Sequence, residues 1–127
     1  MTRYISLEQA LRIARHATGA PVELRDIGLL EAALLRPRTS LFGRDAYPDL
    51  LTKAAAILHS IVANHPFVDG NKRAAWLTMY VFCAKNGVEI EPRDDDVAYD
   101  FVIAVASGKL SEVDEIADVL RGFTASS

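Results

Sequence analysis

The chain has 127 residues, enough for one domain with a single hydrophobic core and too few for two such cores. Half of the residues are hydrophobic and 24% are charged, a balance that excludes an intrinsically disordered chain. A net charge of −3, a pI near 5.5 and the lack of a dense stripe of lysine and arginine argue against nucleic acid as the main ligand.

Charge is unevenly distributed along the sequence. Residues 1–88 carry 11 basic and 7 acidic side chains, whereas residues 89–118 carry 2 basic and 10 acidic ones. The basic part therefore favours an anionic ligand, whereas the acidic part is more simply explained as the solvated face of two surface helices. The single cysteine, Cys83, excludes an internal disulfide and is expected to be buried. With no membrane-length apolar run and no signal peptide, we expect a cytoplasmic protein.

Helix caps and breakers predict three helices in the first half of the chain. Ser6 can cap the first helix, with Gln9 completing a capping box. Asp26 can cap the second, which is short. Pro48 suits the first turn of the third, which is rich in leucine, isoleucine and alanine. The predicted helices cover residues 7–18, 27–35 and 48–64.

Residues 36–47, between the second and third predicted helices, have no helical period. They contain glycine, proline, serine and threonine together with three arginines. This composition predicts a loop or a short β-hairpin, and strand signals are confined to this segment.

The second half of the chain predicts three more helices, and thus an all-α domain of about six helices. The first of them is apolar on nearly all sides, so we expect it to be the central, buried helix. Asp94 or Asp95 can cap the next, and Ser111 can cap the last. The predicted helices cover residues 72–86, 95–107 and 112–122.

The segment joining the two apolar helices contains most of the chemically active side chains. It reads His65-Pro66-Phe67-Val68-Asp69-Gly70-Asn71-Lys72-Arg73. Pro66 disfavours helix at the preceding residue, and Gly70 permits a tight turn. Asn71, Lys72 and Arg73 then fall in the first turn of the next helix. Free main-chain N–H groups and the helix dipole attract anions there, so the segment predicts a phosphate site.

The remaining side chains of this segment suggest group transfer. His65 can accept a proton near neutral pH, and Asp69 can bind an Mg²⁺ ion that bridges phosphates. Phe67 is expected to anchor the segment in the core. A base, a metal carboxylate and a cationic phosphate cradle are the parts that phosphoryl or nucleotidyl transfer needs. Each residue alone has a plainer explanation, as loop, turn or solvated surface. His16 and His59 are expected at the surface or core edge, and Trp76, Tyr80 and Phe82 in the core.

Residues 65–73 resemble the signature of the Fic/Doc superfamily, and the resemblance covers essentially the whole chain as a single domain, residues 1–127. It implies an α-helical fold with a β-hairpin flap near the site, here residues 36–47. In such proteins the flap positions the protein substrate, a role that would fall to Leu41, Phe42 and Arg44 in this chain.

Two positions point to the Doc branch of the superfamily. Fic adenylyltransferases usually have glycine where this chain has Lys72, and a second arginine where it has Trp76. Doc toxins show the same departures, although Pro66 and Gly70 follow the general Fic form. The resemblance then implies a kinase that moves the γ-phosphoryl of ATP to a threonine of elongation factor Tu and stops translation.

The resemblance also implies roles for the site residues. His65 acts as general base, and Asp69 binds Mg²⁺. The phosphates of ATP are held by Gly70, Asn71, Lys72 and Arg73, the last two neutralising charge in the transition state.

Regulation and the alternatives also follow from the resemblance. Many Fic enzymes carry an inhibitory Ser/Thr-x-x-x-Glu-Gly/Asn helix, and the nearest match here fails because Ile116 follows Glu115. A chain without this helix fits a toxin held by a Phd-like antitoxin. The alternatives are a protein adenylyltransferase acting on another target, and a binding module without catalytic activity.

Overall fold

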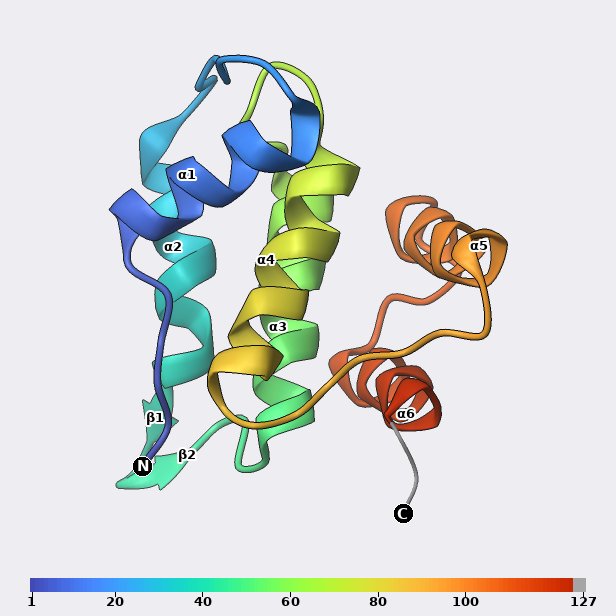
Figure 1. Ribbon diagram of the computed structural model, residues 1–127. Coiled ribbons are helices and arrows are strands. Elements are labelled where there is room, and N and C mark those ends of the chain that lie inside the picture. The colour runs from blue at the N-terminus through green and yellow to red at the C-terminus, as the bar shows by residue number, and fades with distance from the viewer. Residues whose placement is uncertain (125–127) are drawn as a thin grey trace.

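The computed structural model describes residues 1–124 and confirms an all-α architecture with one short hairpin (Figure 1). Over these residues, no helix is both long and apolar enough to cross a membrane. The elements, in chain order, are α1 (Leu7–Thr18), α2 (Ile27–Leu35), the 3₁₀ turn η1 (Arg36–Arg38), β1 (Ser40–Leu41), β2 (Arg44–Asp45), α3 (Leu50–Asn64), α4 (Asn71–Lys85), α5 (Asp95–Ala106) and α6 (Val113–Phe123).

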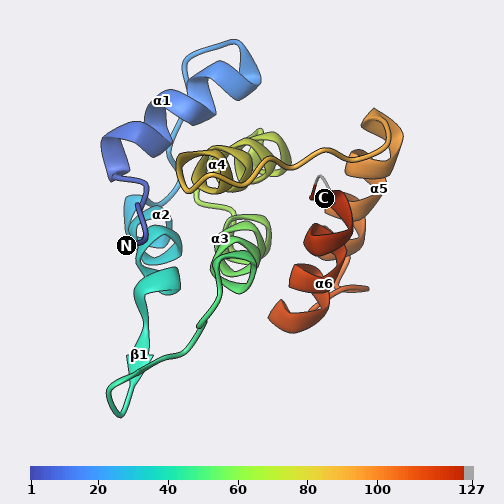
Figure 2. The ribbon, with the colours of Figure 1, turned by 60° about the horizontal axis from the view of Figure 1, so that its bottom comes forward.

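Helices α3 and α4 form the centre of the molecule. Figure 2 shows α1 and α2 on one side of this pair and α5 and α6 on the other. The more deeply buried helix is α3, which packs against α4, α2, α5, α6 and η1. The prediction that α4 is the central buried helix is therefore only partly right: it packs against α1, α3 and α5, but Leu77 and Tyr80 stay partly exposed. The core position of Cys83 is confirmed, and burial raises the pKa of its thiol to about 12.

The helix starts follow the available capping side chains. The capping box of Ser6 and Gln9 is present, and Asp26 and Asp94 cap α2 and α5 as predicted. Two predicted starts are wrong. Pro48 lies outside α3, because the Asp49 carboxylate accepts a hydrogen bond from the Thr52 N–H at 2.8 Å and sets the start at Leu50, two residues later. Ser111 is not the cap of α6, since the helix begins after Glu112 without a side-chain cap.

Aromatic contacts join α4 to the C-terminal helices. The rings of Trp76 and Phe101 meet edge to face, with centroids 6.3 Å apart, and Phe123 packs against both. The side chain of Trp76 is thus part of the interface between α4, α5 and α6, which confirms its predicted packing role.

The predicted hairpin is present but shorter than residues 36–47. Ser40 pairs with Asp45 and Leu41 with Arg44. The two central residues, Phe42 and Gly43, both have positive φ, as a two-residue type I′ turn requires. Residues 36–38 form a 3₁₀ turn because α2 continues into η1, and Pro37 fits the start of that turn.

Candidate functional site

The candidate site lies where α3 ends and α4 begins. Helix α3 stops at Asn64, and His65 takes the left-handed conformation, with φ 50° and ψ 63°. Its imidazole is exposed, whereas the side chain of Phe67 is almost completely buried and anchors the segment as predicted. The chain is therefore exposed from Ala63 to His65 and returns to the core at Pro66 and Phe67.

A second segment, residues 23–26, runs alongside this turn and holds it. The main-chain N–H groups of Arg25 and Asp26 both donate to the Pro66 carbonyl, at 2.8 and 3.0 Å, and the Val68 N–H donates to Glu23. The guanidinium of Arg25 adds hydrogen bonds to the carbonyls of Asn64 and His65, both at 2.6 Å. Sequence reasoning missed Arg25, since nothing near it in the chain indicates a partner 40 residues away.

Asn71 closes the turn from within. Its side-chain carbonyl accepts from the Phe67 N–H at 3.0 Å, and its amide donates to the Phe67 carbonyl at 2.9 Å. The side chain is buried and both its polar groups are used. Only the main-chain N–H of Asn71 is therefore available for the predicted phosphate binding, because the side-chain amide stabilises the turn.

Gly70 lies close to the side chain of Thr18 on α1, which leaves little space for a β-carbon. A β-carbon at this position would approach the Thr18 Cγ2 to 2.5 Å, and φ is +77°. The tight turn predicted at Gly70 is present, and two causes favour glycine there: the backbone conformation and the steric limit set by Thr18.

Replacing Gly70 by alanine is expected to destabilise the fold. The left-handed backbone alone costs about 1–2 kcal/mol in an alanine, and the contact with Thr18 adds to this. The free energy of urea unfolding measures the effect. Thr18→Ser removes Cγ2 but keeps the hydroxyl bonded to Ala14 and Ala20. The double variant should then recover the steric part of the loss, whereas an unchanged unfolding midpoint in Gly70→Ala would contradict the expectation.

The N-terminus of α4 is suited to an anion. Gly70 is its N-cap and supplies no side chain to the first turn. In the structure of residues 1–124, Lys72 and Arg73 are exposed and neither makes an ion pair. Main-chain N–H groups, the positive end of the helix dipole and two cationic side chains thus coincide at one place.

Asp69 is the acidic residue of the site. It is exposed, and its Oδ1 accepts from the Gly70 N–H at 2.8 Å. No cluster of three or more potential metal ligands occurs among residues 1–124. A single carboxylate fits Mg²⁺ that is shared with substrate phosphates, which is how the ion is commonly held, but not a metal site made of protein alone.

The hairpin is not near these residues. Figure 1 places it at the N-terminal end of α3, whereas the motif lies at the C-terminal end. Lys53, which bonds Asp45 at the hairpin base, precedes His65 by an axial distance of about 18 Å. In this structure the hairpin thus lies toward the opposite end of α3 from the motif, and its role in docking a protein target stays a prediction. Leu41, Phe42 and Arg44 are exposed, and any contact they make with a target is remote from His65.

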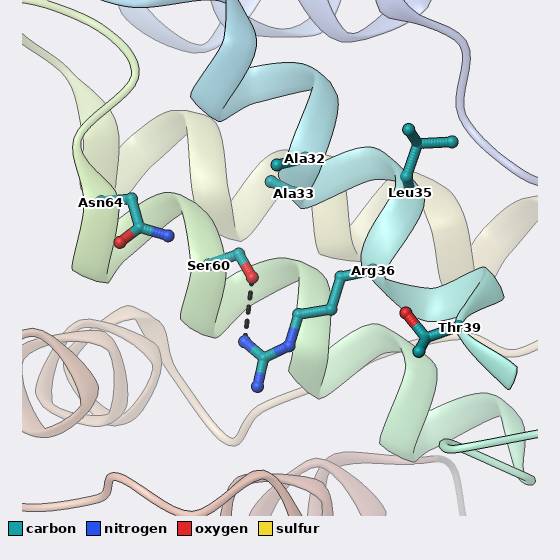
Figure 3. A pocket seen from close by; sticks show the side chains of 7 residues that line it. All are labelled: Ala32, Ala33, Leu35, Arg36, Thr39, Ser60 and Asn64. Atoms are coloured by element: carbon teal, nitrogen blue, oxygen red, sulfur yellow. Dashed lines mark hydrogen bonds between the residues drawn. The ribbon is translucent and has the colours of Figure 1, made fainter. Parts of the chain in front are cut away.

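An open groove of about 560 Å³ occupies the space between hairpin and motif (Figure 3). It lies between α2 and η1 on one side and α3 on the other. Its polar lining extends from Thr39, next to the hairpin, through Ser60 to Asn64, next to His65. Sequence reasoning did not find this groove, because its two walls come from separate helices.

Arg36 makes hydrogen bonds that connect the two sides of the groove. Its guanidinium lies 2.9 Å from the Ser60 hydroxyl, from His59 Nδ1 and, through Nε, from the Tyr47 hydroxyl. Burial lowers the pKa of His59 and the neighbouring Arg36 lowers it further, while Glu112 acts in the opposite direction. A neutral His59 can accept a hydrogen bond from Arg36, and its half-buried position confirms the predicted core edge. His16 is exposed, also as predicted.

Comparison with known proteins gives consistent matches. A protein-family model described as the Fic/DOC family matches residues 4–83, which include the whole motif. A protein named Toxin Doc from Mycolicibacterium smegmatis (strain ATCC 700084 / mc(2)155) is 44% identical over 126 residues, covering 98% of this chain and 96% of that protein. A protein named Protein kinase doc from Escherichia phage P1 is 31% identical over 124 residues, covering 94% of each chain.

Proposed function

Since this chain belongs to the Fic/DOC family, we propose that it is a Doc-like toxin and a protein kinase. In this proposal it transfers the γ-phosphoryl group of ATP to a threonine of elongation factor Tu and inhibits translation. The names of the two relatives support the toxin and kinase parts, and both relatives match over nearly their full length. The proposal treats residues 1–127 as one catalytic domain.

The observation that carries the proposal is that one short turn joins His65, at the end of α3, to the N-terminus of α4, where an anion is favoured. Lys72, Arg73 and the free N–H groups of the first turn hold the phosphates of ATP. His65 accepts the proton of the acceptor hydroxyl. The acceptor oxygen then forms a bond to the γ-phosphorus, the bond to the bridging oxygen breaks, and ADP leaves.

Mg²⁺ completes the proposed site when ATP is bound. The Asp69 carboxylate would hold it together with phosphate oxygens, and it supplies charge neutralisation there. The groove in Figure 3 reaches Asn64, the residue before His65, which supports it as the proposed path of the acceptor segment.

A partner antitoxin is part of the same proposal. The toxin name of one relative supports a Phd-like protein as that partner. Ile27 and Leu35 are exposed apolar residues on α2, suited to an amphipathic helix. Ile116, which interrupts the inhibitory pattern, is fully buried in α6, so this segment is part of the core.

The proposal is tested by incubating the purified protein with ATP, Mg²⁺ and elongation factor Tu, followed by the intact mass of the factor. A gain of one phosphate, absent with His65→Asn, is the expected result. A gain of AMP would instead establish the adenylyltransferase alternative. If the factor does not change, labelled ATP in whole lysate would reveal another acceptor, and nucleotide binding without any transfer would favour a binding module.

A further inference from the structure

The main chain at His65 needs an external support. A left-handed conformation is uncommon for a residue other than glycine, and His65 adopts it at the end of α3. The last carbonyls of a helix also have no partner within the helix. Two of these carbonyls, those of Asn64 and His65, flank the turn that carries the imidazole.

Arg25 supplies this support. Its Nη2 donates to the Asn64 carbonyl and its Nε to the His65 carbonyl, each at 2.6 Å. A guanidinium presents both donors in a rigid plane, so one side chain fixes the relative orientation of two consecutive peptide groups. Its positive charge also lies at the negative end of the α3 dipole.

We infer that Arg25 is a positioning residue for phosphoryl transfer, which holds His65 in the orientation required of a general base. The inference rests on the function proposed above. Arg25 acts on the main chain of His65 and has no role in the chemical step. Loss of the Arg25 side chain removes the bonds to the Asn64 and His65 carbonyls. The His65 N–H still donates to Ile61, and the main-chain N–H groups of residues 25 and 26 still hold Pro66, so the turn persists with a less well-oriented imidazole.

The adjacent Asp26 provides a matched control. Its carboxylate caps α2 through the Leu29 N–H, and its main-chain bond to Pro66 does not depend on its side chain. Asp26→Ala therefore removes a stabilising side chain from the same segment but leaves the bonds to Asn64 and His65 intact. Arg25→Lys keeps the charge without the planar fork.

The test compares Arg25→Ala, Arg25→Lys and Asp26→Ala for kcat, for the KM of ATP and for the urea midpoint. We expect Arg25→Ala to lower kcat on the order of 10²-fold with little change in the KM of ATP, since a small misplacement of a reacting group has an effect of this size. Arg25→Lys should lie between it and the wild type. Asp26→Ala should reduce stability and leave kcat unchanged.

Imidazole NMR spectra separate this inference from the proposed function. The His65 resonance, assigned by its loss in His65→Asn, should move or broaden in Arg25→Ala and stay in place in Asp26→Ala. Equal kcat values and unchanged His65 resonances in both variants would overturn the positioning role. A wild-type protein that transfers no phosphate would refute the proposed function, while the NMR comparison would still decide whether Arg25 positions His65.

Discussion

A His65→Asn variant is expected to fold normally and to lose phosphoryl transfer and toxicity. Loss of a general base lowers rates by about 10²–10⁴-fold. Asparagine is the sharper replacement, because it tolerates the left-handed conformation that His65 adopts better than alanine does. The His65 imidazole is exposed, so its removal should leave the core unchanged.

The measurement has two readouts, the rate of phosphate transfer in vitro and growth arrest on expression. His16→Asn serves as control, since His16 is also exposed but lies on α1. It should retain full activity. Growth arrest by a folded His65→Asn protein, shown to be folded by its unfolding midpoint, would exclude the general-base role.

The motif could be predicted from sequence because its parts are contiguous. A base, a carboxylate and two cations fall within nine residues, and Pro66 and Gly70 mark the turn between two helices. The role of the Asn71 side chain could not be read in the same way. An amide side chain can bind either a phosphate or main-chain groups. Only the position of Phe67 in the structure shows that the Asn71 amide bonds the main chain.

Features that depend on contacts between distant segments could not be predicted from local sequence patterns. Arg25 reaches carbonyls 40 and 39 residues further along the chain, and Thr18 limits the space at Gly70 from another helix. The hairpin was recognised from its turn residues, but its distance from His65 depends on the direction of α3, which composition does not give. The start of α6 was misplaced because Ser111 makes no capping bond.

Lys72→Gly is expected to weaken the kinase without converting it to an adenylyltransferase. The proposed role of Lys72 is to neutralise phosphate charge in the transition state, and removal of one such group costs about 10²–10³-fold in kcat. Lys72→Ala should show nearly the same loss, which would separate the effect of charge from that of backbone freedom. Lys109→Ala, at an exposed lysine far along the chain, is the matched control and should be active.

The packing of Trp76 explains why conversion should fail. AMP transfer in the related adenylyltransferases is associated with a second arginine at this position, but here the indole packs against Phe101 and Phe123. Glycine at position 72 would open space where the phosphates are proposed to bind, and it supplies no second cation. An arginine at position 76 would in turn leave the contact between α4, α5 and α6 incomplete. The mass of the modified acceptor shows whether phosphate or AMP has been transferred. We predict that a change to AMP transfer needs both positions 72 and 76 to be altered. Attachment of AMP by Lys72→Gly alone would contradict this prediction.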